Sequence, residues 1–181
     1  PSDIANEIKD ENIKVVNECF PSDKLKDKKF DVITSIACFY DIENPSNFCS
    51  EIKKLLKPQG IWVVEFAYLP SVLQNLAYDG IVHEHLCLYS LSTFEPLLRK
   101  NHLKIFNVQE NDNNGGSLQV WMTYEENNLY DNKQNKENIF KLKIKEFDLS
   151  LDDLATYTRF EIRVKNHKQE LVELLHTIKK Q

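Results

Sequence analysis

The densest group of titratable side chains in the sequence is His83-Glu84-His85, which follows Gly80 and the apolar pair Ile81-Val82. An imidazole titrates near neutral pH, so either histidine could take a proton from a substrate, and the carboxylate could orient it. On an extended backbone the two histidines would point to one side and Glu84 to the other. A polar loop with two hydrogen-bonded histidines is an equally good interpretation of these residues taken alone.

We expect no metal site. The zinc-protease pattern HExxH would need a second histidine where the chain has Cys87. The four cysteines, Cys19, Cys38, Cys49 and Cys87, form no CxxC pair, so a structural zinc is not indicated. An even cysteine count in a long, charged chain with only 4 glycines is not a disulfide framework, and a reducing cytoplasm fits it better.

Composition narrows the class of partner. The chain has 181 residues, enough for one domain with a hydrophobic core and some additional structure. Its formal net charge is -5 and it has no long basic stretch, which argues against nucleic acid or an anionic membrane surface as partner. No apolar run is long enough to span a bilayer and no signal-peptide pattern is present, so the sequence indicates neither a membrane span nor export.

Apolar periodicity predicts an α/β fold. Strands are expected at 13–16, 30–37, 61–66, 103–108 and 117–124, and helices near residues 4–8, from Pro45 and from Ser92. Alternation of this kind predicts a mostly parallel sheet with helices on both faces, and the turn at 113–116 predicts a closing antiparallel hairpin. Because ligands bind at the carboxyl ends of such strands, the segments to search are 19–22, 37–42, 65–85 and 109–117.

The last third of the sequence divides into a connector, an ambiguous segment and a long helix. Residues 125–137 are polar and predict a solvated connector, while 138–148 fit a strand or a helix equally well. The Lys/Glu runs near 133–146 predict a solvated face. A long helix is predicted after Ser150 and Asp153, which resemble a capping box. Its apolar seam needs a packing partner and runs through Tyr157, Phe160, Val164, His167, Leu171, Leu174 and Ile178.

Three sequence motifs resemble, in the same order along the chain, those of a known protein family. They are the segments 63–69, 78–90 and 114–118, with His83-Glu84-His85 inside the second, and they resemble the sugar C-methyltransferases. That family transfers a methyl group from S-adenosylmethionine to a carbon next to the ketone of nucleotide-linked 4-keto-deoxysugars. The resemblance implies a Rossmann-like class I methyltransferase fold whose first two strands are missing from this sequence. Pro1-Ser2 resembles the residues that follow the acid holding the cofactor ribose.

The resemblance also implies roles for individual residues. His85 would be the general base that removes the proton next to the ketone, and Glu84 and His83 would orient it or hold sugar hydroxyls. Cys19 and Phe20 are candidates for the adenine side of S-adenosylmethionine. Ala37 and Cys38 are candidates near its methionyl part.

Family members carry parts that this sequence lacks: a Cys-rich zinc-binding domain, a Gly-rich loop and a second Rossmann-like domain. Residues 1–124 are therefore expected to be the C-terminal two-thirds of a methyltransferase domain, and 125–181 a connector and helix leading to an absent domain. On this interpretation the chain is the middle of a longer protein, unstable and inactive when expressed alone.

Two departures from the family pattern lie on the substrate side. Val82 stands where the sugar enzymes commonly have tyrosine, and Asn114 where they often have histidine. Alternatives therefore remain: an O- or N-methyltransferase of the same fold acting on another small molecule, or a non-catalytic scaffold. A nicotinamide-dependent oxidoreductase would need a GxGxxG sequence, which this chain does not contain.

Overall fold

The computed structural model describes residues 3–180, apart from the side chains of residues 4 and 6. Four strands form one sheet in the order β1-β2-β4-β3, with β1 at Phe30–Ile36, β2 at Leu56–Ala67, β3 at Leu103–Asn111 and β4 at Ser117–Tyr124. β1 pairs with β2 in parallel, and β4 lies antiparallel between β2 and β3. Three strands therefore point the same way and the closing hairpin inserts the fourth, which confirms the predicted α/β class.

The strand predicted at 13–16 is wrong. The segment is irregular, and Ile13 and Val15 are 54% and 38% exposed. A strand needs the backbone groups of a neighbour to pair with, and within residues 3–180 this segment has none. The adjoining prediction near residues 4–8 is met only by a short 3₁₀ turn at Asp3–Glu7, and Pro1-Ser2 lies outside the described residues.

Strand β2 starts earlier than the sequence predicts. Residues 57–60, which contain a proline and a glycine and precede the strand predicted at 61–66, are part of the strand through a register shift that pairs Leu56 with Phe30 and Ile61 with Val32. The preceding helix α1, Pro45–Leu55, begins at the predicted proline, and the Asn44 side chain accepts a hydrogen bond from the Asn47 amide at 3.0 Å.

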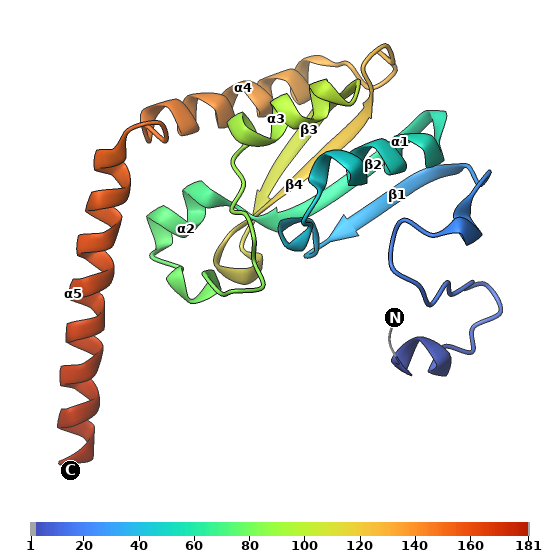
Figure 1. Cartoon of the computed structure of the whole chain (residues 1–181). Helices are drawn as coiled ribbons and strands as arrows, with labels where there is room; N and C mark the ends of the chain where they lie inside the picture. The colour runs from blue at the N-terminus through green and yellow to red at the C-terminus, as the bar shows by residue number, and fades with distance from the viewer. Residues whose placement is uncertain (1–2, 181) are drawn as a thin grey trace.

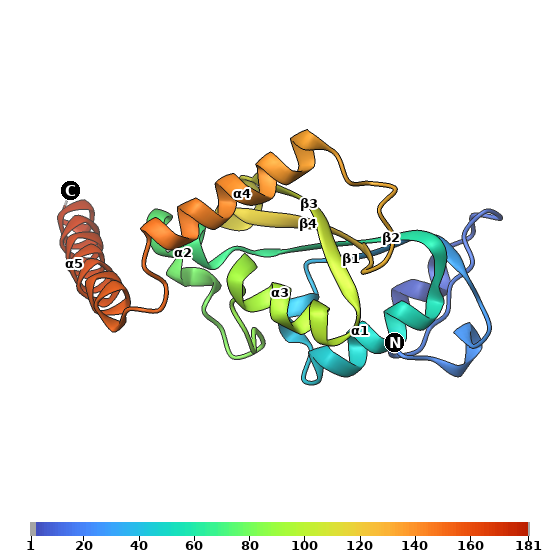
Figure 2. The same ribbon diagram turned by 90° about the horizontal axis from the view of Figure 1, so that it is seen from above.

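Helices lie on both sides of the sheet. Figures 1 and 2 show α1 and α3, Leu91–Lys100, on one side and α4, Lys133–Asp148, on the other. The N-cap of α3 is Ser90 and not Ser92 as predicted, because Ser90 Oγ accepts from the Thr93 amide in a capping box. Two helices were not predicted in full: α2, Leu69–Asn75, and α4, whose first turn starts inside the expected connector.

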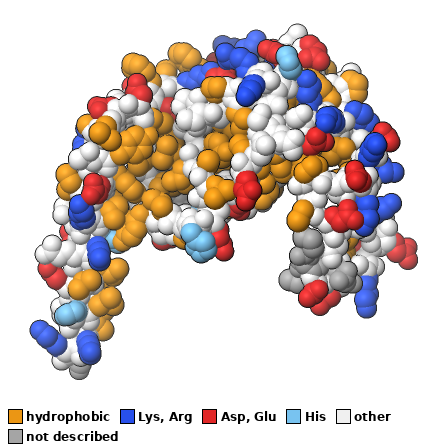
Figure 3. Space-filling model, in the orientation of Figure 1, with side chains coloured by type: hydrophobic (Ala, Val, Ile, Leu, Met, Phe, Trp, Pro, Cys, Tyr) orange, Lys and Arg blue, Asp and Glu red, His pale blue; other side chains and the backbone are white. Residues whose placement is uncertain are grey.

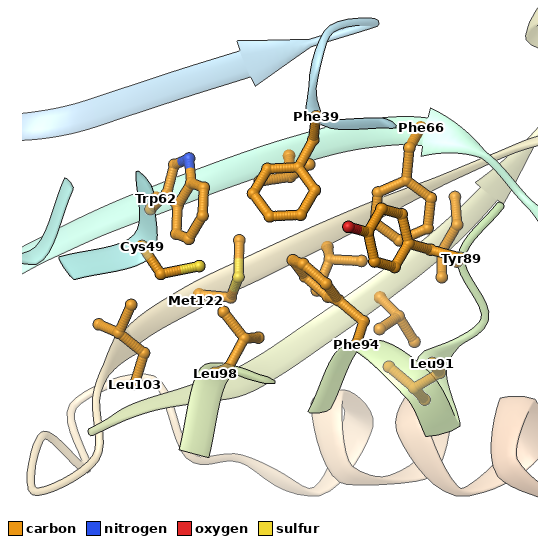
Figure 4. Close-up of a cluster of buried hydrophobic side chains, with 14 of the residues drawn as sticks. Phe39, Cys49, Trp62, Phe66, Tyr89, Leu91, Phe94, Leu98, Leu103 and Met122 are labelled. Carbon is orange, nitrogen blue, oxygen red and sulfur yellow. The ribbon is translucent and has the colours of Figure 1, made fainter. Parts of the chain in front are cut away.

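The core lies between the sheet and the helices α1 and α3. Phe39, from the 3₁₀ turn Phe39–Asp41 after β1, is fully buried and its ring centroid lies 5.2 Å from that of Phe94 in α3. Phe66 in β2 lies at the same distance from Phe94 (Figure 4). These aromatic contacts fix the loop after β1 against the sheet, and that loop reaches the candidate site.

The last helix, α5, spans Leu154–Lys179 and projects away from the rest of the chain (Figure 1). Its N-cap is Asp153, whose carboxylate accepts from the Ala155 amide at 2.9 Å. The predicted apolar seam is exposed along the second half of the helix, where Leu171, Leu174 and Ile178 are 43%, 55% and 57% exposed. The division of the chain near residue 124 stays a prediction.

Candidate active site

The loops that follow the strands meet at one end of the sheet. The loop after β1 is tied to β2, because the Ala37 amide donates to the Glu65 carbonyl at 2.9 Å. The loop after β2 is tied to the start of β4, because the Tyr68 amide donates to the Gly116 carbonyl at 3.1 Å. Predicted segments 37–42, 65–85 and 109–117 therefore do come together.

His85 is half-buried and held in one orientation. Its Nδ1 lies 2.7 Å from the Gly80 carbonyl oxygen, which can only accept, so Nδ1 carries the proton of the neutral ring. Its ring lies on Tyr40, with centroids 4.3 Å apart. The Tyr40 carbonyl accepts from the amides of Leu86 and Cys87 at 2.9 and 3.2 Å. The Nε2 atom is left with its lone pair available, which is the state that a general base requires.

His83 and Glu84 do not share this setting. Their side chains are 92% and 77% exposed, and His83 Nε2 lies 4.0 Å from a Glu84 carboxylate oxygen. A contact so exposed contributes little free energy. The Gly80 carbonyl therefore orients His85, and the two neighbouring side chains face solvent.

A buried carboxylate that the sequence analysis did not single out lies at the end of β2. Glu65 is 6% exposed and accepts three side-chain amide hydrogen bonds, from Asn113 at 2.8 Å, Gln119 at 2.5 Å and Asn111 at 3.1 Å. Burial alone would raise the pKa of Glu65, but the three amide donors outweigh it and lower that pKa. A glutamate within an otherwise apolar strand was the signal that could have identified it.

The hairpin tip after β3 packs against α2. Asn75 donates to the Gly115 carbonyl at 2.9 Å, and Gly116 adopts a φ of 120°. A Cβ at Gly116 would lie 2.4 Å from the Ser71 Cβ, so only glycine fits there. Asn114 lies at this tip with a φ of 51°, in the left-handed region that asparagine tolerates.

Comparison with known proteins identifies the family. A methyltransferase domain model matches residues 1–108, and a C-methyltransferase C-terminal domain model matches residues 112–181. The chain belongs to the S-adenosylmethionine-dependent C-methyltransferases. The C-methyltransferase NovU of Streptomyces niveus is 33% identical over 84 residues, which are 46% of this chain and 20% of NovU. The chain thus spans a fifth of the length of that relative.

Solved structures resemble this C-methyltransferase chain more distantly. A Burkholderia thailandensis 1,6-didemethyltoxoflavin-N1-methyltransferase with bound S-adenosylhomocysteine has a TM-score of 0.44 and 16% identity, covering 54% of this chain and 45% of its own. The mitomycin 7-O-methyltransferase MmcR has a TM-score of 0.44 and 17% identity, covering 54% and 30%. Likenesses at this level support no argument about substrate.

S-adenosylmethionine is the cofactor of C-methyltransferases, and one groove suits part of it. An apolar groove of about 740 Å³ runs along the exposed edge of β1, lined among others by Cys19, Phe20 and Cys38 but not by Ala37. Val32 and Ile36 of β1, which line this groove, are 54% and 49% exposed. Figure 3 shows hydrophobic side chains gathered over the middle of the face drawn and along the projecting helix α5. The lining suits an adenine ring and a methylene chain. Its hydroxyl side chains are Thr34 and Ser35, and no cationic side chain that could pair with a carboxylate is among the described residues that line it.

The structure shows the surroundings of three predicted cofactor contacts, Cys38, Phe20 and Ala37. Burial raises the pKa of the Cys38 thiol, which therefore stays protonated and acts as an apolar contact and not as a nucleophile. The Phe20 ring packs edge-on against Phe48 of α1, with centroids 4.8 Å apart. Ala37 adopts a φ of 53° and contributes its amide to the β1–β2 connection described above.

Within residues 3–180 no helix combines the length and the apolar character needed to cross a bilayer.

Proposed function

We propose that the complete protein methylates a carbon next to the ketone of a nucleotide-linked deoxysugar. The orientation of His85 is the observation that carries this proposal. Removing a proton from carbon requires a base with a free lone pair, and the Gly80 carbonyl fixes the tautomer that leaves Nε2 free. The match to a C-methyltransferase model and the identity to NovU support carbon as the methyl acceptor.

In this mechanism His85 Nε2 accepts the proton from the carbon next to the ketone. Tyr40, under the imidazole ring, keeps the base in place while its charge changes. His83 and Glu84 are exposed and hold substrate hydroxyls in the proposal, since the Gly80 carbonyl already orients the base. S-adenosylmethionine supplies the electrophilic methyl group when bound. The groove beside β1, with Cys19, Phe20 and Cys38, would take its adenine and methionyl parts, with Ala37 in the adjoining loop.

The division of the chain is part of the same proposal. Residues 1–124 would form the methyltransferase part that carries the base, and residues 125–181 would connect it to a further domain. Localisation in the cytoplasm, where nucleotide sugars and S-adenosylmethionine are available, would follow from that function.

Calorimetric binding of S-adenosylhomocysteine by the complete natural chain, combined with turnover of keto-sugar nucleotides, tests the function. His85→Ala should bind S-adenosylhomocysteine as the wild type does and lose about 10²- to 10⁴-fold in turnover, the usual contribution of a general base. His176→Ala is the matched control, because His176 is exposed on α5. Absence of S-adenosylhomocysteine binding by the wild type would leave a non-catalytic scaffold. Methyl transfer to oxygen or nitrogen with little effect of His85→Ala would indicate the other methyltransferase class.

A further inference from the structure

Two side chains of α5 contact the segment that precedes the His85 loop. The Arg163 guanidinium donates to the carbonyls of Leu73 at 2.8 Å and Gln74 at 2.9 Å, in the last turn of α2. His167 Nδ1 lies 3.0 Å from the Tyr78 hydroxyl, and the two rings meet edge to face with centroids 5.7 Å apart. Arg163 and His167 are four residues apart, one turn of helix, so both lie on the face of α5 that meets α2.

Arg163 completes the end of α2. The last carbonyls of a helix have no partner within the helix, and a cation there also offsets the partial negative charge of the helix end. The helix ends at Leu76, which adopts a φ of 57° and points the chain toward the 3₁₀ turn Tyr78–Gly80. Arg163 therefore fixes the point at which the chain leaves α2.

The turn Tyr78–Gly80 connects the α5 contacts with the base. Tyr78 begins the turn, and the carbonyl of Gly80 at its other end accepts the hydrogen bond from His85. Beyond it, Ile81 and Val82 are 56% and 41% exposed and supply little packing. The direction of the Gly80 carbonyl thus depends on how the turn is held from the α2 side.

We propose that Arg163 and His167 are positioning residues for methyl transfer: they hold the α2 end and the Tyr78–Gly80 turn so that the Gly80 carbonyl keeps His85 in its base form. This role rests on the proposed function for its effect on catalysis. The second half of α5 has an exposed apolar face. The two contacts join α5 to the loop that carries His85. The position of α5 is thereby coupled to the geometry of His85.

Hydrogen exchange of the complete chain tests the contacts without relying on activity. The reporters are the amides of Ala77, Ile81 and His85, each of which donates to a backbone carbonyl in this segment. Arg163→Ala should raise their exchange rates about threefold to tenfold, the range expected for partly exposed hydrogen bonds to a charged group. Arg159→Ala is the matched control, because the Arg159 guanidinium donates to Thr156 of its own helix and, among the described residues, to no carbonyl of α2. Equal rates in the two variants would overturn the proposal.

A spectroscopic signature at His85 tests the positioning itself. The carbon chemical shifts of the imidazole should report the Nδ1–H tautomer in the wild type, and a larger Nε2–H fraction in Arg163→Ala and Tyr78→Phe. Tyr78→Phe keeps the ring and removes only the hydroxyl that meets His167, so it tests the contact even if Arg163→Ala folds poorly. An unchanged tautomer in both variants would contradict a positioning role.

Turnover separates this inference from the proposed function. Arg163→Ala should lower kcat about fivefold to tenfold with little change in KM for the cofactor, as expected when only the base is displaced. If the wild type shows no methyl transfer, the proposed function fails while the exchange and tautomer results still decide whether α5 holds the loop. If the wild type is active and Arg163→Ala matches Arg159→Ala in all three measurements, the positioning role fails and the function stands.

Discussion

Two glutamates are buried near the end of β2, one in the strand and one in α4, and their partners differ in kind. Glu146 of α4 is 4% exposed and accepts from the backbone amides of Leu91 at 2.5 Å and Ser92 at 2.8 Å, and from the Tyr68 hydroxyl at 2.8 Å. Glu65 of β2 is almost as buried, but its three donors are side-chain amides. Glu146 thus joins α4 to the start of α3, while Glu65 joins a strand end to a hairpin tip.

The difference indicates what each carboxylate does. Backbone donors at a helix start have one position each, so Glu146 fixes the relative placement of two helices and contributes to the stability of the whole unit. Side-chain amides have rotamers and can exchange partners, so Glu65 controls the arrangement of the loops around the candidate site. One network is architectural, and the other is expected to affect turnover more than stability.

Glu146→Ala should have the largest effect on stability. It removes the acceptor of the buried Leu91 amide, of the buried Tyr68 hydroxyl and of the part-buried Ser92 amide, and we expect a loss of about 3 to 4 kcal/mol in the free energy of unfolding. Urea denaturation would measure it. Glu137→Ala, on the same helix, removes a side chain that is 45% exposed and pairs with Lys133, and it should cost less than about 0.5 kcal/mol. A loss at Glu146 as small as that of the control would contradict an architectural role.

Glu65→Gln should separate turnover from stability. The substituted amide keeps one acceptor oxygen and sets an NH₂ group against amide donors, so the Asn111 and Asn113 side chains must rearrange. We expect a loss of about 1 to 2 kcal/mol in the free energy of unfolding and a fall of about tenfold in kcat per folded molecule. Steady-state kinetics at a temperature where both variants are folded would show it. If Glu146→Gln lowered kcat as much as Glu65→Gln, the two networks would not differ as argued.

The pH dependence of stability tests the role of the Glu65 carboxylate through a smaller expected effect. Because the folded-state pKa of Glu65 lies below its usual value near 4.5, ionised Glu65 stabilises the fold fully above that pH. The contribution is lost as pH falls through the folded-state pKa. The stability difference between wild type and Glu65→Gln, which does not titrate, should therefore narrow below about pH 4.5. A constant difference down to acid pH would contradict the role of the charged form.

The sheet was predictable from the sequence because its strands are buried and apolar. The run at 30–37 and the segment 117–124 become β1 and β4 within a residue or two. The failure at 13–16 has the opposite cause, since an apolar alternation specifies a strand only if a neighbour provides hydrogen-bond partners. Helix α4 was obscured because one of its buried residues is the charged Glu146, whose partners are far away in sequence.

The candidate site was predictable only in part. The residue types in His83-Glu84-His85 indicated a base, but the difference between the oriented His85 and its exposed neighbours depends on the Gly80 carbonyl and on Tyr40. Both contacts arise from the path of the backbone, which residue types do not encode. Arg163 and His167 likewise gained a connection with the site only through the placement of α5 beside α2.

Tyr68→Phe should have the smallest effect among these variants. The substitution removes one donor to Glu146 Oε1, which still accepts from the Leu91 amide, and the phenyl ring leaves no buried polar group unpaired. We therefore expect a loss of only about 1 kcal/mol in the free energy of unfolding, measured by urea denaturation. In the Glu146→Ala background the same change should cost less, because the hydroxyl has already lost its acceptor. Equal costs in both backgrounds would show that the contribution of the Tyr68 hydroxyl does not come from its hydrogen bond to Glu146, and the backbone amides of α3 would then be the partners that matter to the architectural network.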